Sequence, residues 1–213
     1  RGLGDVYKRQ GLPTMATSLN PRARHTPRLV LRPFRRRDVS AMHDAATESL
    51  PDLKKWLPWA NNRYSRSVSS HFVRDSMASW NEGRAFDFAI RRINDPDRHL
   101  GNVSVWFTSR PNRIGEIGYW VRSDETGQGI CTEAVVRVLQ IAFEDLAMHR
   151  VTLRIAVGNL GSERVAAKLG FTLEGILRHE VKVGDEWMDH TIWGLLVEEW
   201  QVERDRYRDQ AWV

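Results

Sequence analysis

The stretch GEIGYWVRSDETGQGI, residues 115–130, decides the fold of this chain. Its first half, up to Val121, is apolar and aromatic with a period of two, which is typical of a β-strand. Its second half turns on Gly127 and Gly129 and leads into a helix with one apolar face that extends to about Leu146. Glycines permit a tight turn, and the first amides of the helix are unpaired at the positive end of its dipole. Such a turn can hold a diphosphate, although a glycine turn before a helix is also common without a ligand.

Upstream of this stretch, the sequence pattern predicts a strand, two helices and a meander. The strand lies at 29–33; Asp38 then caps a helix that Pro51 ends, and a second helix runs from Ser67 to Gly83. From residue 84 the apolar period changes to two. The resulting antiparallel strands are expected at 85–93, 100–108 and 114–121.

Downstream of the helix, strands and helices alternate again. A strand is expected at 150–157, a short helix at 162–169, and two strands at 171–183 and 186–196, with a charged helix closing the chain. We therefore predict an α/β (α+β) fold. Its sheet would be mixed and mostly antiparallel, with about seven strands flanked by helices, and not a doubly wound parallel sheet.

The termini differ in character from the 28–200 region, which we expect to be one domain. Residues 1–14 match the translated end of a common sequencing-library transposon, so we treat them as a sequencing artefact and Met15 as a start. Residues 15–27 are expected to form a flexible arm, because they combine two prolines with basic side chains and little periodicity. Residues 201–213 are expected to form a helical tail.

Composition limits the classes of protein that this chain could be. Of its 213 residues 41% are hydrophobic and 28% charged, without an apolar run long enough for a membrane span, which indicates a soluble protein. The single cysteine, Cys131, excludes an internal disulfide framework, and without a recognisable secretory signal it points to the cytoplasm. The net charge is +5, and the Lys and Arg residues that give it are scattered among acidic residues along the chain. No basic run alternates with aromatics, so dedicated nucleic-acid binding is not expected.

The glycine turn resembles that of the GNAT acetyltransferase superfamily. In that family the fourth strand ends beside a Gln/Arg-x-x-Gly-x-Gly/Ala turn that holds the phosphates of CoA; here the turn is DETGQG, residues 124–129, with Asp124 at the first position. The strand before it, residues 115–121, is similar to the fourth strand of the RimJ/RimL branch of the family. The whole resemblance covers roughly residues 28–200. Further matching signatures are NLGS at 159–162, KLGF at 168–171, Glu174-Gly175 and the hairpin segment EWMDH at 186–190.

This resemblance implies acetyl-CoA as co-substrate and a sheet whose parallel fourth and fifth strands splay apart to admit the pantetheine arm. The transfer would be direct, so Cys131 is not needed as a nucleophile and is interpreted as a small packed residue. The expected cofactor contacts are Tyr119, Trp120, Val121, Gly127, Gln128, Gly129, Ile130, Cys131 and Asn159. For Asn159 an ordinary loop turn is the alternative.

Three residues are candidates for handling protons. Glu116 lies where many members of the family carry a strand-four glutamate that accepts the amine proton, with a paired structural glutamate as the alternative. Glu180 resembles a glutamate proposed as base on the RimL side. Ser162 matches a family serine near the CoA sulfur, where a hydroxyl could protonate the leaving thiolate; it could also cap the helix that it begins.

The acceptor side is less well defined by the sequence. Trp56 and Trp59 could form a wall of the acceptor site, although core packing is an alternative for either. His190 lies on the hairpin near the expected pocket, with a structural role for the Asp189-His190 pair as the alternative. The histidines lack metal-ligand spacing, so no catalytic metal is expected.

The resemblance to RimJ/RimL enzymes implies acetylation of protein N-termini, with ribosomal proteins as partners. An α-amino group, whose pKa is about 7.7–8.0, needs little help from a base. A small amine such as a polyamine or an aminoglycoside is the alternative acceptor, and a non-catalytic protein that binds acetyl-CoA or the ribosome is the alternative of another class. The sequence does not give the oligomeric state and leaves a homodimer open.

Overall fold

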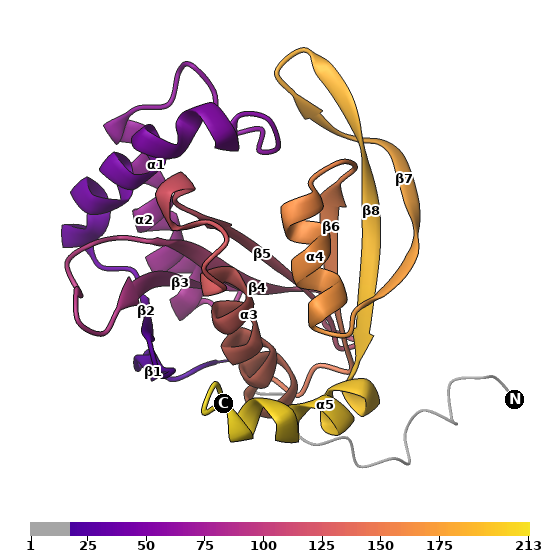
Figure 1. Ribbon diagram of the computed structural model, residues 1–213. Coiled ribbons are helices and arrows are strands. Elements are labelled where there is room, and N and C mark those ends of the chain that lie inside the picture. Colours follow the sequence, from indigo (N-terminus) through magenta and orange to yellow (C-terminus); the bar gives the residue numbers. More distant parts are fainter. Residues whose placement is uncertain (1–17) are drawn as a thin grey trace, which may run out of the picture.

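The computed structural model describes residues 18–213 and contains a single eight-stranded sheet in the order β1-β2-β3-β4-β5-β6-β8-β7 (Figure 1). The strands are β1 Arg24–His25, β2 Leu29–Pro33, β3 Ala85–Arg92, β4 Gly101–Ser109, β5 Ile114–Val121, β6 Arg150–Ala156, β7 Thr172–Val183 and β8 Glu186–Leu196. The predicted mixed, mostly antiparallel fold is confirmed. The added strand, β1, is a two-residue segment paired with β2. The artefact assigned to residues 1–14 lies outside the described residues.

Among the described residues, five α-helices flank the sheet, and several of their bounds differ from the predictions by a few residues. They are α1 Val39–Leu53, α2 Arg66–Asn81, α3 Ile130–Gln140, α4 Leu160–Lys168 and α5 Val197–Asp209. Pro51 lies inside α1, because a proline removes only its own N–H and the Lys54 amide still bonds to the Leu50 carbonyl. The helix α2 begins at Arg66, one residue before Ser67. A π-turn at 141–145 continues α3 almost to Leu146.

Residues 18–27, the described part of the arm expected at 15–27, contact the domain through several buried side chains, which does not fit a flexible arm there. Leu19 is buried, and its carbonyl accepts a hydrogen bond from the Trp80 indole at 3.0 Å. Arg24 is also buried and forms an ion pair with Asp145. The sequence did not indicate these contacts, because each one is made to a residue far away in the sequence.

The expected boundary at residue 200 also has to be moved, because α5 begins at Val197 and packs on the core. Trp200 stacks on Phe143 with ring centroids 5.8 Å apart, and Tyr207 stacks on Trp200 at 5.9 Å. Both aromatic side chains of α5 are buried. This helix is therefore part of the domain and not a separate tail.

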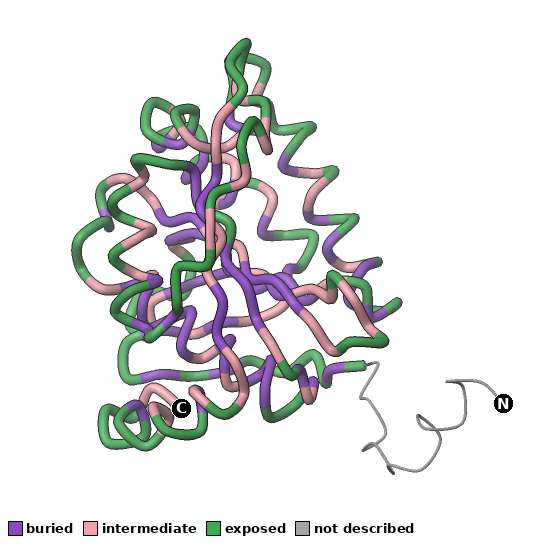
Figure 2. The backbone as a smooth tube through the Cα atoms, turned by 90° about the vertical axis from the view of Figure 1, so that its right-hand side faces the viewer, coloured by how far each residue is buried: buried purple, intermediate pink, exposed green. Residues whose placement is uncertain are grey.

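The two faces of the central strands carry different residues, because successive side chains of a strand point to opposite faces. Phe88, Val103 and Ile117 belong to the main core together with the apolar face of α3. The alternate face carries Ala89, packed with α1 and α2, and Trp120, packed with α1. Buried residues follow the central strands, whereas exposed ones gather on the outer helices and at the hairpin tip (Figure 2).

The parallel pair β5 and β6 separates soon after it starts. Backbone pairing covers only 114–116 of β5 and 150–152 of β6, although both strands continue for several residues. The predicted splay is therefore present, and it leaves one side of Ile117–Val121 without a partner strand. We call this divergence the fork. Within residues 18–213, no helix is long and apolar enough to cross a membrane.

Candidate active site

The turn before α3 presents backbone donors beside the fork. Gly127 and Gly129 have φ of 75° and 78°, a left-handed conformation that glycine adopts without strain. The first backbone hydrogen bond of the helix runs from the Glu133 amide to the Gly129 carbonyl. Among the hydrogen bonds of the described residues, none uses an amide of 127–132 as donor. Six consecutive N–H groups at the positive end of the helix dipole are thus available to an anion.

These amides open onto a cavity of about 450 Å³, which we call the cofactor cavity. It lies between the end of β5, the 123–132 segment, α4 and the end of α1. Eight of the nine predicted cofactor contacts line it, namely Tyr119, Trp120, Val121, Gly127, Gly129, Ile130, Cys131 and Asn159. Gln128 does not. Its side chain points instead to Arg92 and to the Asp124 carbonyl, which holds the turn in shape.

Arginine side chains form ion pairs with the acidic residues of the turn. Arg92 forms an ion pair with the buried Glu125 at 2.6 Å, and Arg98 bonds to both Glu125 and Asp124. Asp124, the residue that departs from the family pattern, also pairs with Arg122 at 2.9 Å. Its carboxylate points to these arginines, so its role is to fix the loop. The amides of 127–132 are left without a partner among the described residues.

Two cations of α4 line the cofactor cavity and were not singled out from the sequence. Arg164 and Lys168 both reach it, and neither has an ion-pair partner in the part of the chain that the structure describes. They are four residues apart, so they lie on one face of the helix. Cationic side chains at this spacing, opposite a row of free amides, favour a ligand with several phosphates.

Burial raises the pKa of the Cys131 thiol to about 12. At neutral pH this side chain is a thiol and not a thiolate, so it is a poor nucleophile. Its packed, unreactive environment agrees with the structural interpretation.

Ser162 lies in the first turn of α4, at the end of the cofactor cavity where Tyr119 is found. It does not cap the helix. Asn159 is the N-cap residue, and its Oδ1 accepts the Ser162 amide at 3.3 Å. The Tyr119 hydroxyl donates to the Ser162 carbonyl at 3.5 Å, and burial raises the pKa of this phenol, so it stays protonated. The Tyr119 hydroxyl therefore lies beside the backbone of Ser162, and both residues line the cofactor cavity.

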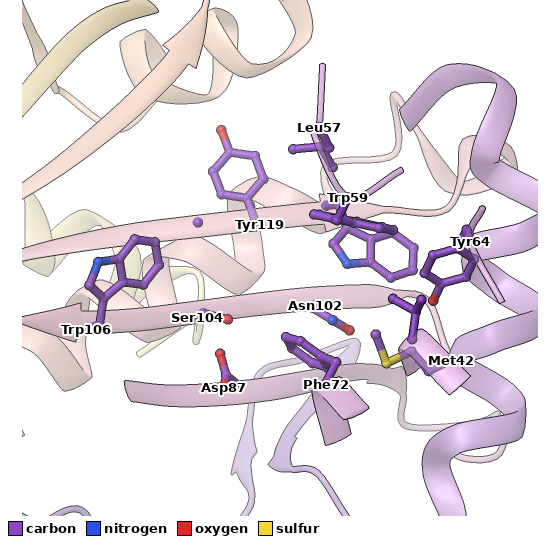
Figure 3. Close-up of a pocket in the computed structure, with 13 residues that line it drawn as sticks. Met42, Leu57, Trp59, Tyr64, Phe72, Asp87, Asn102, Ser104, Trp106 and Tyr119 are labelled. Atoms are coloured by element: carbon purple, nitrogen blue, oxygen red, sulfur yellow. The ribbon is translucent and has the colours of Figure 1, made fainter. Parts of the chain in front are cut away.

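A second cavity, of about 410 Å³, lies between α1, the segment that follows it, α2 and the strands β3, β4 and β5 (Figure 3). We call it the acceptor cavity. Of the two tryptophans named from the sequence, Trp59 lines this cavity and Trp56 lines the cofactor cavity. The two cavities share Leu57, Tyr119 and Trp120 as lining residues. They therefore meet at the end of β5.

The Trp120 side chain is fixed between the cavities by polar contacts. The Asn102 side-chain amide has one orientation in which it bonds to both Trp120 and His99. In that orientation its oxygen accepts from the Trp120 indole at 3.2 Å, and its nitrogen donates to His99 Nε2 at 2.7 Å. Burial lowers the pKa of His99 to about 3, so the imidazole is neutral and can accept. Trp59 packs on Trp120 from the acceptor side, with ring centroids 5.8 Å apart.

Glu116 and Glu180 are brought together by a residue that the sequence did not reveal, Arg154. Its Nε and Nη2 lie 2.9 Å from Glu116 Oε2, and its Nη1 lies 2.6 Å from Glu180 Oε1. Burial raises the pKa of Glu116, and Arg154 opposes that shift only in part. Glu116 pairs with Thr152 at the last paired position of the fork, yet neither glutamate lines a cavity.

His190 is buried on β8 opposite Leu177 and lines neither cavity, so the structure does not bring it to the acceptor side. Over residues 18–213, no cluster of three or more His, Cys, Asp or Glu side chains is arranged to hold a metal ion.

Known proteins are similar to this chain in both sequence and architecture. The sequence model for the acetyltransferase (GNAT) domain matches residues 28–172. The chain belongs to the GNAT acetyltransferase family. It is an acyltransferase, and its eight-stranded sheet with the β5–β6 fork is a GNAT fold.

Relatives of this GNAT chain include named enzymes. It is 39% identical to "Probable N-acetyltransferase YjcK" of Bacillus subtilis (strain 168) over 112 residues, which are 52% of this chain and 61% of that protein. It is 26% identical to the [ribosomal protein uS5]-alanine N-acetyltransferase of Escherichia coli (strain K12) over 180 residues, covering 82% and 91% of the two chains. The structure of Mycobacterium smegmatis RimJ in complex with CoA-disulfide is similar with a TM-score of 0.75 and 27% identity, covering 84% and 89%.

Proposed function

We propose that this GNAT enzyme transfers the acetyl group of acetyl-CoA directly to the α-amino group at the N-terminus of a protein. The observation that carries the proposal is the meeting of two cavities at Tyr119 and Trp120, one lined by free amides and the other by aromatic side chains. The named activity of the E. coli relative on ribosomal protein uS5 supports a ribosomal protein as the acceptor. We place this reaction in the cytoplasm, where ribosomal proteins are made.

In this proposal the residues of the cofactor cavity hold CoA. The amides from Gly127 to Cys131 would bind the diphosphate, and Arg164 and Lys168 would pair with phosphate charge. Asn159 would bind the pantetheine amides. Acetyl-CoA supplies the activated acyl group, and the unpaired side of Ile117–Val121 provides backbone donors for the carbonyl oxygen on which negative charge develops.

The transfer needs one proton removed and one delivered. The neutral amine nitrogen bonds to the acetyl carbon, the carbon–sulfur bond breaks, and the thiolate takes a proton from the hydroxyl of Ser162 or Tyr119. Ser162 is our first candidate for this acid. Glu116, at the fork, is our candidate for accepting the amine proton, with Arg154 holding both it and Glu180.

A screen of acceptors tests the proposal. Purified protein with acetyl-CoA should release CoA thiol when given peptides that begin with Ser or Ala. The same peptides with a blocked α-amino group should release none, which excludes acetylation of side chains. Turnover with spermidine or aminoglycosides, but not with any free peptide N-terminus, would contradict the N-terminal function and favour a small amine as acceptor.

A further inference from the structure

The acceptor cavity is built almost entirely of apolar and aromatic side chains, with one ionisable carboxylate at its floor. Figure 3 shows Asp87 rising from β3 toward Ser104 on the neighbouring strand β4. The aromatic lining residues are Trp59, Tyr64, Phe72, Trp106, Tyr119 and Trp120. A carboxylate in such surroundings loses much of the hydration that it has in water.

Asp87 has no cationic partner within residues 18–213. It is 8% exposed and lines the cavity, but no arginine, lysine or histidine of the described chain forms an ion pair with it. Burial raises the pKa of Asp87, while the hydroxyls of Ser104 and Ser76 favour its charged form. By contrast, the buried Asp38 is bonded to both Arg32 and Arg91. An unpaired buried carboxylate is unfavourable for the fold, so its presence calls for a functional reason.

A cation entering the cavity would supply what Asp87 lacks. It would form a charge-assisted hydrogen bond with the carboxylate in a site shielded from water, where this interaction is strong. The surrounding rings would add cation–π attraction. A neutral acceptor of the same size would leave the carboxylate unpaired.

The position of Asp87 in the sheet separates it from the transfer itself. Asp87 pairs with Ser104, and Ser104 pairs with Gly118 on β5. Neighbouring strands are about 4.8 Å apart, so Asp87 lies roughly 10 Å from β5. The fork lies on the side of β5 away from β4, and Ser162 lines the cofactor cavity but not the acceptor cavity. The group that meets Asp87 is therefore not the amine that is acetylated.

We propose that Asp87 binds a second cationic group of the acceptor, an ammonium or a guanidinium, and so selects substrates with a positive charge away from the reacting amine. This inference rests on the proposed function, because it takes the aromatic cavity to be the acceptor side. A lysine or arginine side chain close to a peptide N-terminus has this chemistry, and so does the distal amine of a polyamine.

Matched pairs of acceptors and Asp87→Asn test the proposal. The peptide pair has Lys or norleucine at the second or third position after an N-terminal Ser, and the amine pair is spermidine and butylamine. We expect wild-type protein to prefer the cationic member of a pair by about tenfold or more in kcat/KM, and Asp87→Asn to abolish that preference through KM. Asp209→Asn, which changes an exposed aspartate of α5 far from the acceptor cavity, should leave the preference intact.

The readouts separate this inference from the proposed function. CoA affinity measured by calorimetry should be the same in wild type and Asp87→Asn, which shows that the variant is folded. If only spermidine is acetylated and its preference depends on Asp87, the N-terminal function fails and the role of Asp87 stands. If peptides are acetylated equally well with Lys or norleucine, or if Asp87→Asn lowers turnover of both members alike, the role of Asp87 is overturned.

Discussion

The two cavities that meet at Trp120 differ in the groups that line them. The cofactor cavity offers backbone amides of one continuous turn, residues 127–132, with side chains holding that turn from outside. The acceptor cavity offers side chains from α1, the segment after it, α2 and three strands. A backbone site tolerates changes of side chain but not of backbone conformation, whereas a side-chain site responds to each residue. We therefore expect CoA binding to depend mainly on backbone conformation, and acceptor binding to depend on individual side chains.

The largest effect is expected at Ser162, which lines the cofactor cavity next to Tyr119. Ser162→Ala should lower kcat by about 100-fold, the low end for loss of a general acid, with the affinity for CoA little changed. Steady-state kinetics with a Ser-initiated peptide and calorimetry with CoA measure the two quantities. Ser40→Ala, which removes an exposed hydroxyl of α1, is the control. An unchanged kcat in Ser162→Ala would move the acid role to Tyr119.

A change of backbone conformation should damage the cofactor half alone. Gly129→Val places a β-branched residue at a φ of 78°, a strain of about 1–3 kcal/mol, so the Kd for CoA should rise about 10- to 100-fold. Gly175→Val is the control, because a side chain there meets no atom within 4 Å. Calorimetry measures both variants. Equal affinity in wild type and Gly129→Val would show that the turn does not hold CoA.

A change of side chain should damage the acceptor half alone. Trp59→Ala removes a wall of the acceptor cavity that packs on Tyr64 and Trp120. We expect the KM for the acceptor to rise by about tenfold and the Kd for CoA to stay the same. Trp187→Ala, on the exposed hairpin, should change neither. An equal loss of CoA affinity in Trp59→Ala would mean that the two halves are not independent.

The smallest effect concerns the stability cost of the unpaired carboxylate. Because the pKa of Asp87 is raised in the folded state, wild type should lose stability as the pH rises from the ordinary aspartate range through that raised value. Asp87→Asn does not titrate there, so it should be the more stable protein at neutral pH, by on the order of 1 kcal/mol. Urea unfolding at acidic and neutral pH measures the difference. Greater stability of wild type at neutral pH would contradict an unpaired Asp87.

The difference between the halves also explains what the sequence could predict. The glycine turn, the strand before it and the helix after it are local, so their pattern indicated both the fold and the cofactor contacts. Only Gln128 failed to reach the cavity, because its side chain bonds to Arg92 from a distant strand. The packing of Leu19 under Trp80 was missed for the same reason.

Apart from Trp59 and Tyr119–Trp120, the residues of the acceptor cavity were not predicted, because the strand order and register bring them together from distant parts of the chain. Asp87 reads as one polar residue in an alternating strand, and only the register with Ser104 and Gly118 places it below an aromatic cavity. Arg154 likewise looks like an exposed strand residue, yet it links Glu116 to Glu180. Trp56 and Trp59 lie three residues apart, and the structure assigns them to different cavities.

The most direct test of a backbone cofactor site is to titrate CoA into ¹⁵N-labelled protein and follow the amide resonances. The account predicts that the largest shifts occur at Gly127–Thr132, while the amides of β3 around Asp87 change little until an acceptor is added. Shifts centred on β3, or no shifts in the turn before α3, would contradict the division of the site into a backbone half and a side-chain half.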